Sequence, residues 1–110
     1  MSRLVVMLPL LVGCGWSWDK YVSEKEQATC EQLVACGVAP AYGWTTVDDC
    51  LADPHITGEE GSTACDGYDG SAAKKCITAY LAVDCDNFTG IYNDIDVCNQ
   101  VCPNSGDTGT

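Results

Sequence analysis

The chain has few of the residue types that perform acid–base catalysis or bind nucleic acid. Its 110 residues include one histidine, His55, and five lysines and arginines against sixteen aspartates and glutamates, for a formal net charge of −11. An acidic surface repels phosphate backbones and anionic lipid headgroups, so we expect no nucleic-acid partner. A lone loop histidine, without a G-x-S-x-G elbow or a Ser-His-Asp set, leaves no candidate catalytic residue. We therefore expect no enzyme.

Long hydrophobic runs and closely spaced metal ligands are also scarce. The main apolar run extends from Leu4 to Val12, well short of the roughly 20 residues that a transmembrane helix needs. Cysteines at metal-ligand spacing occur once, as Cys98 and Cys102, without the second pair that a zinc site requires. The Asp- and Gly-rich segments do not match the ligand positions of an EF-hand loop. We expect no spanning helix, no metal and no cofactor.

Cysteine, in contrast, is plentiful, with nine residues, and the first of them follows an export pattern. Arg3 precedes the apolar run, and Leu11-Val12-Gly13-Cys14 ends it, which is the order of a secretory signal peptide. Leu-Val-Gly-Cys resembles the lipobox of bacterial lipoproteins. The resemblance implies that residues 1–13 are a cleaved signal peptide and that Cys14 carries the lipid. The alternatives are an ordinary signal peptide with an incidental cysteine and a weak membrane anchor.

The remaining cysteines form an even set, as expected for a disulfide scaffold in an exported protein. All eight are predicted to pair, which gives four bridges and 105 possible connectivities: Cys30, Cys36, Cys50, Cys65, Cys76, Cys85, Cys98 and Cys102. We assign no pairs, but we expect Cys98 and Cys102 to bond to earlier helices. Because the apolar residues are sparse, the bridges should stabilise the domain more than its core does.

Local patterns predict an all-α fold, a small disulfide-rich bundle of about four short helices after the cleaved signal helix. Ser23 and Glu26 form a capping box, and Gly37 is a C-terminal stop. The later segments show caps, a proline stop and an apolar face at a period near 3.6. The expected helices cover residues 24–36, 46–53, 71–84 and 94–102.

The same patterns divide the chain into segments. We expect a lipidated tether over residues 14–22, a disulfide-stapled helical domain over 23–102 and a disordered tail over 103–110. Trp16, Trp18 and Tyr21 in the tether have rings that favour a membrane interface. Alternatively, they pack on the domain, and the sequence does not decide between the two.

A second resemblance covers most of the expected domain. The lipobox, the C-x5-C-G segment from Cys30 to Gly37, C-L-A-D, C-I-x-A-Y and a closing C-x3-C are together similar to the small cysteine-rich lipoproteins of myxobacteria. The similarity implies a class and a location, and it brings no activity. Gly15, where an Asp would be typical of inner-membrane retention in lipoproteins, favours the outer membrane.

We therefore expect a lipid-anchored cell-envelope protein that acts as a small binding or structural module. Its expected partners are the membrane, through the lipid on Cys14, and an unknown envelope protein or glycan. The contact surface is predicted in the loop over residues 54–70 and at exposed aromatics such as Trp44 and Tyr68. The alternatives are a secreted disulfide-rich effector and a small metal-dependent envelope enzyme.

Overall fold

The computed structural model describes residues 15–104, and over this range the chain is helical with no strand. The helical, disulfide-rich fold class is therefore confirmed. The described residues contain three α-helices and three short 3-10 helices: α2 (Trp18–Ala35), η1 (Ala39–Tyr42), α3 (Val47–Leu51), α4 (Gly70–Ala82), η2 (Tyr92–Asp94) and η3 (Asp96–Gln100). The expected signal helix, Cys14 and residues 105–110 lie outside the described residues.

The helix α2 begins six residues before the predicted start at residue 24. Its N-cap is Ser17, whose side chain accepts a hydrogen bond from the backbone N–H of Lys20, so the predicted capping box at Ser23 lies inside the helix. The early start is stabilised by the burial of Tyr21, which is 6% exposed, in the core. Residues 18–22 thus belong to the domain and do not form a tether.

The predicted end of α2 is confirmed. Gly37 has a φ of +74°, a left-handed conformation that glycine adopts without steric cost. The N–H of Val38 donates to the carbonyl of Leu33, and the N–H of Gly37 donates to that of Val34. These two bonds form a Schellman motif, which satisfies the last carbonyl groups of the helix.

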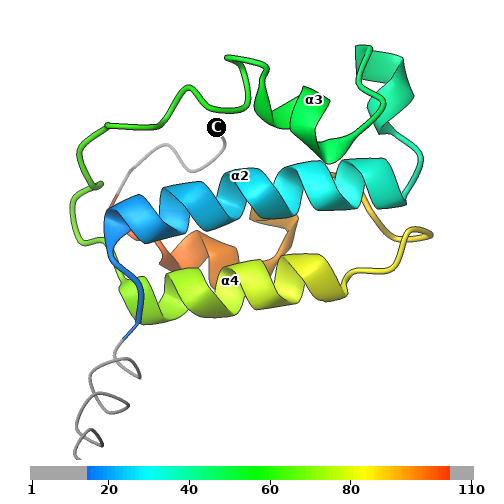
Figure 1. Ribbon diagram of the computed structural model, residues 1–110. Helices are drawn as coiled ribbons and strands as arrows, with labels where there is room; N and C mark the ends of the chain where they lie inside the picture. The colour runs from blue at the N-terminus through cyan, green and yellow to red at the C-terminus, as the bar shows by residue number, and fades with distance from the viewer. Residues whose placement is uncertain (1–14, 105–110) are drawn as a thin grey trace, which may run out of the picture.

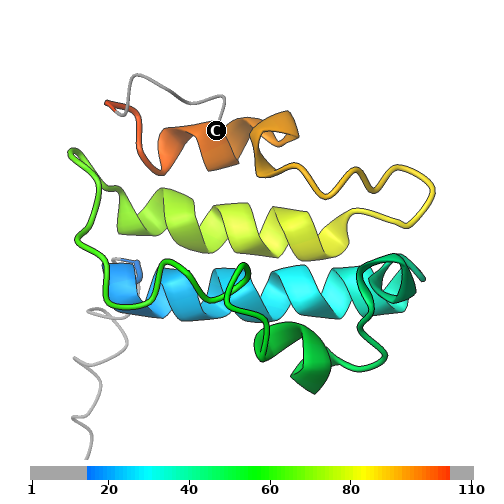
Figure 2. The same cartoon turned by 90° about the horizontal axis from the view of Figure 1, so that it is seen from above.

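The two long helices, α2 and α4, lie side by side and run in the same direction (Figure 1). Seen from above, η3, α4, α2 and α3 follow one another across the molecule (Figure 2). One core cluster lies between α2, α4 and the C-terminal segment and includes Tyr80 and Val101. A second, smaller cluster lies between α2, α3 and η1 and includes Trp44. Phe88 packs against both clusters and so connects them.

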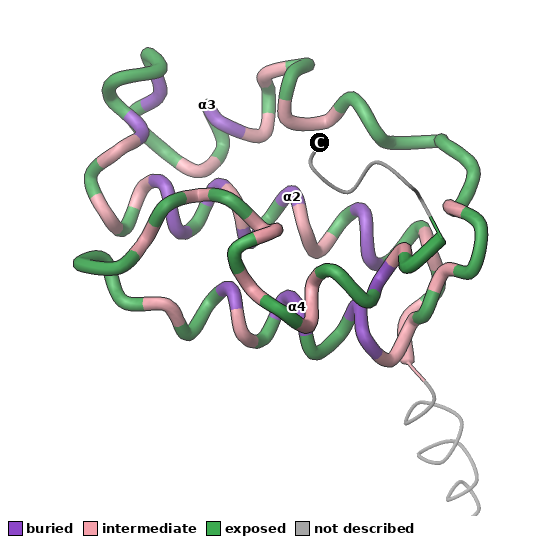
Figure 3. The backbone as a smooth tube through the Cα atoms, turned by 180° about the vertical axis from the view of Figure 1, so that it is seen from behind, coloured by how far each residue is buried: buried purple, intermediate pink, exposed green. Residues whose placement is uncertain are grey.

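Four disulfides join neighbouring elements, and they use every cysteine that was predicted to pair. Their members are Cys30–Cys50, Cys36–Cys85, Cys65–Cys102 and Cys76–Cys98. The first joins α2 to α3, and the last joins α4 to η3. The segment between α3 and α4 contains no buried residue (Figure 3). The Cys65–Cys102 bridge therefore contributes to holding this loop, which buries no residue of its own.

The predicted fourth helix over residues 94–102 is wrong, because that segment forms η2 and η3. Asp, Asn and the β-branched residues in this segment have low helix propensity. Cys98 bonds to α4, as expected, but Cys102 bonds to Cys65 in the loop before α4 and not to a helix. Two cross-links to different elements thus fix a segment with little tendency to form an α-helix.

Candidate binding groove

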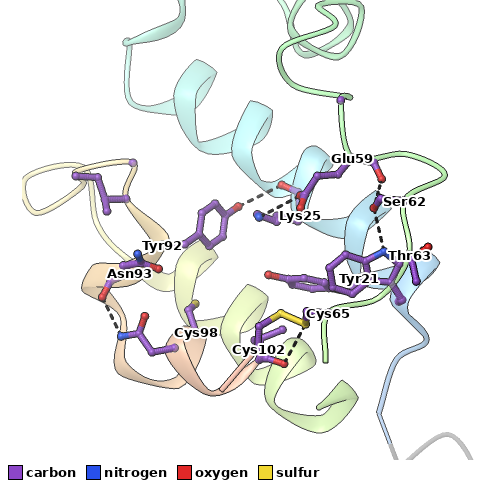
Figure 4. Close-up of a pocket in the computed structure, with 16 residues that line it drawn as sticks. Tyr21, Lys25, Glu59, Ser62, Thr63, Cys65, Tyr92, Asn93, Cys98 and Cys102 are labelled. Atoms are coloured by element: carbon purple, nitrogen blue, oxygen red, sulfur yellow. Dashed lines mark hydrogen bonds and ion pairs between the residues drawn. A yellow bond between two sulfur atoms is a disulfide. The ribbon is translucent and has the colours of Figure 1, made fainter. Parts of the chain in front are cut away.

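A groove of about 710 Å³ lies between α2 and two later segments. Trp18, Tyr21 and Lys25 contribute one wall from α2. Residues in the range 58–65 form a second wall, and residues in the range 90–102 form a third. Volumes of this size are typical of small-molecule and peptide sites. We call this cavity the main groove (Figure 4).

Lys25 is held at the centre of the main groove by two aromatic rings and one carboxylate. Its Nζ atom lies 5.7 Å from the ring centroid of Tyr21 and 5.4 Å from that of Tyr92. The carboxylate of Glu59 lies 3.3 Å from the same nitrogen. Cation–π and ionic contacts thus act together on one ammonium group. Burial, followed by the charge of Glu59, raises the pKa of Tyr21 to about 12, which keeps its hydroxyl neutral.

The hydroxyl groups of Thr29 and Tyr92 fix the position of the Tyr92 ring. Their oxygen atoms are 2.7 Å apart, and both hydroxyls lie within hydrogen-bond distance of the carbonyl oxygen of Lys25. The Tyr92 ring also stacks on the ring of Tyr80, with a centroid separation of 3.9 Å. Burial raises the pKa of Tyr92 above its usual value. The aromatic side of the main groove is therefore preorganised by packing and hydrogen bonds.

Next to Lys25 on α2, Glu26 is a buried carboxyl with an unusual environment. It is 7% exposed, and its Oε2 atom has no hydrogen-bond partner among the residues described. Burial raises its pKa to about 7, with further contributions from a hydrogen bond to Glu60 and from the charges of Glu60 and Glu59, while Lys25 opposes the shift. Both of these glutamates belong to the loop that walls the groove. Protonated Glu26 thus favours the contact between α2 and this loop.

Aromatic residues near the N-terminus pack on the domain. The sequence alone did not decide between this packing and a position at a membrane interface. Trp16 and Trp18 contact the core cluster, and Tyr21 belongs to it. The indole Nε1 of Trp18 donates to the Ser62 hydroxyl at 3.2 Å. The Tyr68 hydroxyl donates to the carbonyl oxygen of Trp16 at 2.8 Å. These contacts connect the N-terminal residues to the loop and are incompatible with an interfacial collar.

A second groove, of about 550 Å³, lies beside η1 and is lined by Tyr42, Trp44, Asp53 and His55 among others. Tyr42 is 61% exposed and stacks on Trp44, with a centroid separation of 4.9 Å. The indole Nε1 of Trp44 donates to Asp53. The backbone N–H of His55 is the largest cause of the lowered pKa of Asp53. The imidazole of His55, whose side chain is 94% exposed, lies 3.1 Å from that carboxylate.

The structure corrects the predicted contact surface in part. The loop over residues 54–70 does line the main groove. Trp44 is buried, however, and Tyr68 is half-buried, so neither is an exposed aromatic. Sequence reasoning missed Lys25, Glu26 and Tyr42. The position of Lys25 one helical turn after Tyr21 was the local indication that the two side chains meet. Its partners Glu59 and Tyr92 are distant in the chain, so no local pattern indicates them.

The described residues, 15–104, contain no group of three His, Cys, Asp or Glu side chains able to hold a metal ion. In the same range, no helix is both long and apolar enough to cross a membrane. No family model, curated protein or solved structure matches the chain.

Proposed function

We propose that the chain is an exported, lipid-anchored envelope protein whose cross-linked domain binds a protein or glycan in the main groove. The four disulfides indicate an oxidising extracellular or envelope compartment. The lipobox resemblance at Leu11-Val12-Gly13-Cys14 supplies the anchor, and Gly15 favours the outer membrane. The groove supplies the surface for recognition.

The observation that carries the proposal is the pairing of the cysteines. Every cysteine within residues 15–104 is in a disulfide with a partner from the same range. These four disulfides account for eight of the nine cysteines, and Cys14 is the ninth. An unpaired cysteine in an oxidising compartment is a liability for the folded protein. Lipidation of Cys14 removes that liability and uses the thiol at the position where the lipobox requires it.

The composition of the main groove supports binding better than catalysis. Apart from the Lys25–Glu59 pair, its polar side chains are hydroxyls and amides, including Thr63 and Asn99, and aromatic rings such as Trp18 contribute to its apolar surface. Such amphipathic walls suit peptides and sugars, which present both apolar faces and hydrogen-bonding groups. The one cation of this groove, Lys25, is already held by Glu59. We therefore assign no enzymatic activity.

The anchor is tested by intact-mass spectrometry of the chain purified from its envelope, before and after reduction. We expect the mass of a chain beginning at Cys14 with its acyl groups, and a gain of two hydrogens for each of the four disulfides. Cys14→Ala should move the protein out of the membrane fraction. An unmodified mature N-terminus, or an unlipidated chain in the culture supernatant, would contradict the proposal and favour a secreted effector.

The groove is tested by capturing partners from detergent-solubilised envelopes with two matched variants. Thr63→Arg adds bulk and charge to the wall of the main groove, and Ala52→Arg makes the same addition at an exposed site outside it. Within residues 15–104 neither side chain makes a hydrogen bond, so both variants should fold as the parent does. We expect a partner that the parent and Ala52→Arg retain and that Thr63→Arg loses. Equal capture by all three would exclude the groove.

A further inference from the structure

The N-terminal residues are fastened to the start of α4. The backbone N–H of Trp16 donates to the carbonyl oxygen of Gly70 at 3.2 Å. A Cβ atom on Gly15 would collide with the backbone of Gly70, and a Cβ on Gly70 would collide with that of Trp16. Only two glycines allow so close an approach of the two backbones. The chain therefore leaves the domain at a fixed point, and no flexible tether separates residue 15 from the fold.

An unusual surface begins at this exit point. Gly15 and one face of α4, which carries Lys74, Lys75, Thr78 and Ala82, form a single shallow depression of about 520 Å³. The helix α4 contains no acidic residue, although acidic residues are more than three times as numerous as basic ones in the whole chain. The acidic residues therefore lie outside α4, and this face of the helix is basic although the protein as a whole is acidic.

The two lysines on this face have no carboxylate partner among the described residues. Lys20 pairs with Glu24, and Lys25 pairs with Glu59, each at 3.3 Å, whereas no ion pair involves Lys74 or Lys75. Both are exposed. Of the four lysines in the expected mature chain, the two unpaired ones are therefore neighbours on the surface that adjoins the exit point.

We propose that this face of α4 docks on the membrane that holds the anchor, with Lys74 and Lys75 against the phosphates of its anionic headgroups. The inference rests on the proposed lipidation of Cys14. One residue spans about 3.8 Å, so a lipid on residue 14 holds Gly15 at the headgroup layer. The positive face of α4 then lies nearest the phosphates, which attract lysines at short range. The acidic remainder of the domain is repelled and points away.

Docking in this orientation leaves the recognition surfaces free. The helices α2 and α4 form adjacent layers, and the main groove is lined by α2, the loop over residues 58–65 and the C-terminal segment, with no residue from α4. Figure 1 shows η1 at the opposite end of the helical pair from the exit point. Tyr42 on η1 therefore serves as a reference residue far from the bilayer.

The test is hydroxyl-radical footprinting of the lipidated full chain on two kinds of vesicle. One is phosphatidylcholine alone, and the other is phosphatidylcholine mixed with phosphatidylglycerol. Leu81, which is 43% exposed on α4, reports docking. We expect its oxidation to slow by about fivefold or more on the anionic vesicles, with no change at Tyr42. High salt should abolish the protection, because screening weakens headgroup attraction.

Matched charge reversals identify the responsible residues. Lys74→Glu/Lys75→Glu should lose the protection of Leu81, whereas Lys20→Glu, at an exposed lysine on α2, should retain it. Equal oxidation of Leu81 on both vesicles, or full protection in Lys74→Glu/Lys75→Glu, would overturn the inference.

A second preparation separates this inference from the anchor itself. If mass spectrometry finds no lipid on Cys14, the chain is coupled through that thiol to a maleimide lipid and measured again. Protection of Leu81 in the coupled chain would support docking through α4, even though the native chain is then not lipidated. A lipidated chain without protection would leave the anchor in place and refute the docking face.

Discussion

Replacing Glu26 with glutamine should change how the stability of the fold depends on pH. The unfolded glutamate loses its proton near its ordinary pKa of 4.5, whereas in the folded chain the pKa is raised to about 7. Between these values the folded state binds more protons than the unfolded state does. The free energy of unfolding must therefore fall as the pH rises through this window, and the whole loss is present above about pH 7.

The magnitude follows from the same shift. At about 1.4 kcal/mol for each pH unit between the two pKa values, the ionised carboxyl costs the folded state roughly 3–4 kcal/mol at most. The two acidic neighbours, Glu59 and Glu60, are exposed to solvent, and screening reduces their share of the cost. We expect the parent to lose about 1–2 kcal/mol between pH 5 and pH 8.

Urea unfolding without reductant, followed by circular dichroism, measures this loss. Glu26→Gln should remove most of the slope, because the amide stays neutral. Glu60→Gln should reduce it, because the like charge is gone. Glu31→Gln, at an exposed position on the same helix, should keep the slope of the parent. A Glu26→Gln variant with an unchanged slope, or a parent more stable at pH 8 than at pH 5, would refute the reasoning.

Two further predictions concern the cap of α4 and the order in which the disulfides open. Asp69→Ala should lower the free energy of unfolding by about 1 kcal/mol, because the Asp69 carboxylate caps α4 by accepting from two backbone N–H groups; an unchanged urea midpoint would contradict this role. Under limiting reductant, Cys36–Cys85 should open before Cys30–Cys50, because Cys85 is exposed whereas Cys30 and Cys50 are both 0% exposed. Alkylation and peptide mapping at successive times would show the order, and simultaneous opening would argue for global unfolding instead.

The helices with strong local signals were predictable from the sequence. In α4, Ala73, Cys76, Ile77 and Tyr80 recur at helical spacing, and all four are buried, so the period alone located the helix. At the start of the helix predicted over residues 46–53, Thr46 caps α3 by accepting from the N–H of Asp49. These features depend on contacts within a few residues, which local patterns report directly.

The start of α2 was not predicted, because the residues around it are compatible with two different structures. Ser17 followed by Trp18, Tyr21 and Val22 is also a helix start with an apolar face, but aromatic rings close to a lipobox equally suit a membrane interface. The ring contacts of Trp18 and Tyr21 with Tyr68 show that these residues pack on the domain. No window of the sequence contains that information, because the contact spans about half the chain.

The main groove was beyond sequence reasoning for the same reason. Lys25 and Glu26 are consecutive on α2, yet one is held in the groove by an aromatic pair and the other is buried beside a carboxylate. Both environments depend on the loop after α3, which buries no residue of its own. The position of that loop is set by a disulfide, and cysteine spacing does not determine the pairing.

The loop wall of the main groove is therefore held by a few specific contacts. The Cys65–Cys102 bridge fixes its end, the Lys25–Glu59 ion pair fixes its middle, and the indole of Trp18 holds the turn near Ser62. An exposed ion pair contributes little energy alone, so we expect the bridge and the protonated form of Glu26 to hold this wall more firmly than the ion pair does. Opening of the Cys65–Cys102 bridge, or ionisation of Glu26 above about pH 7, should loosen this wall.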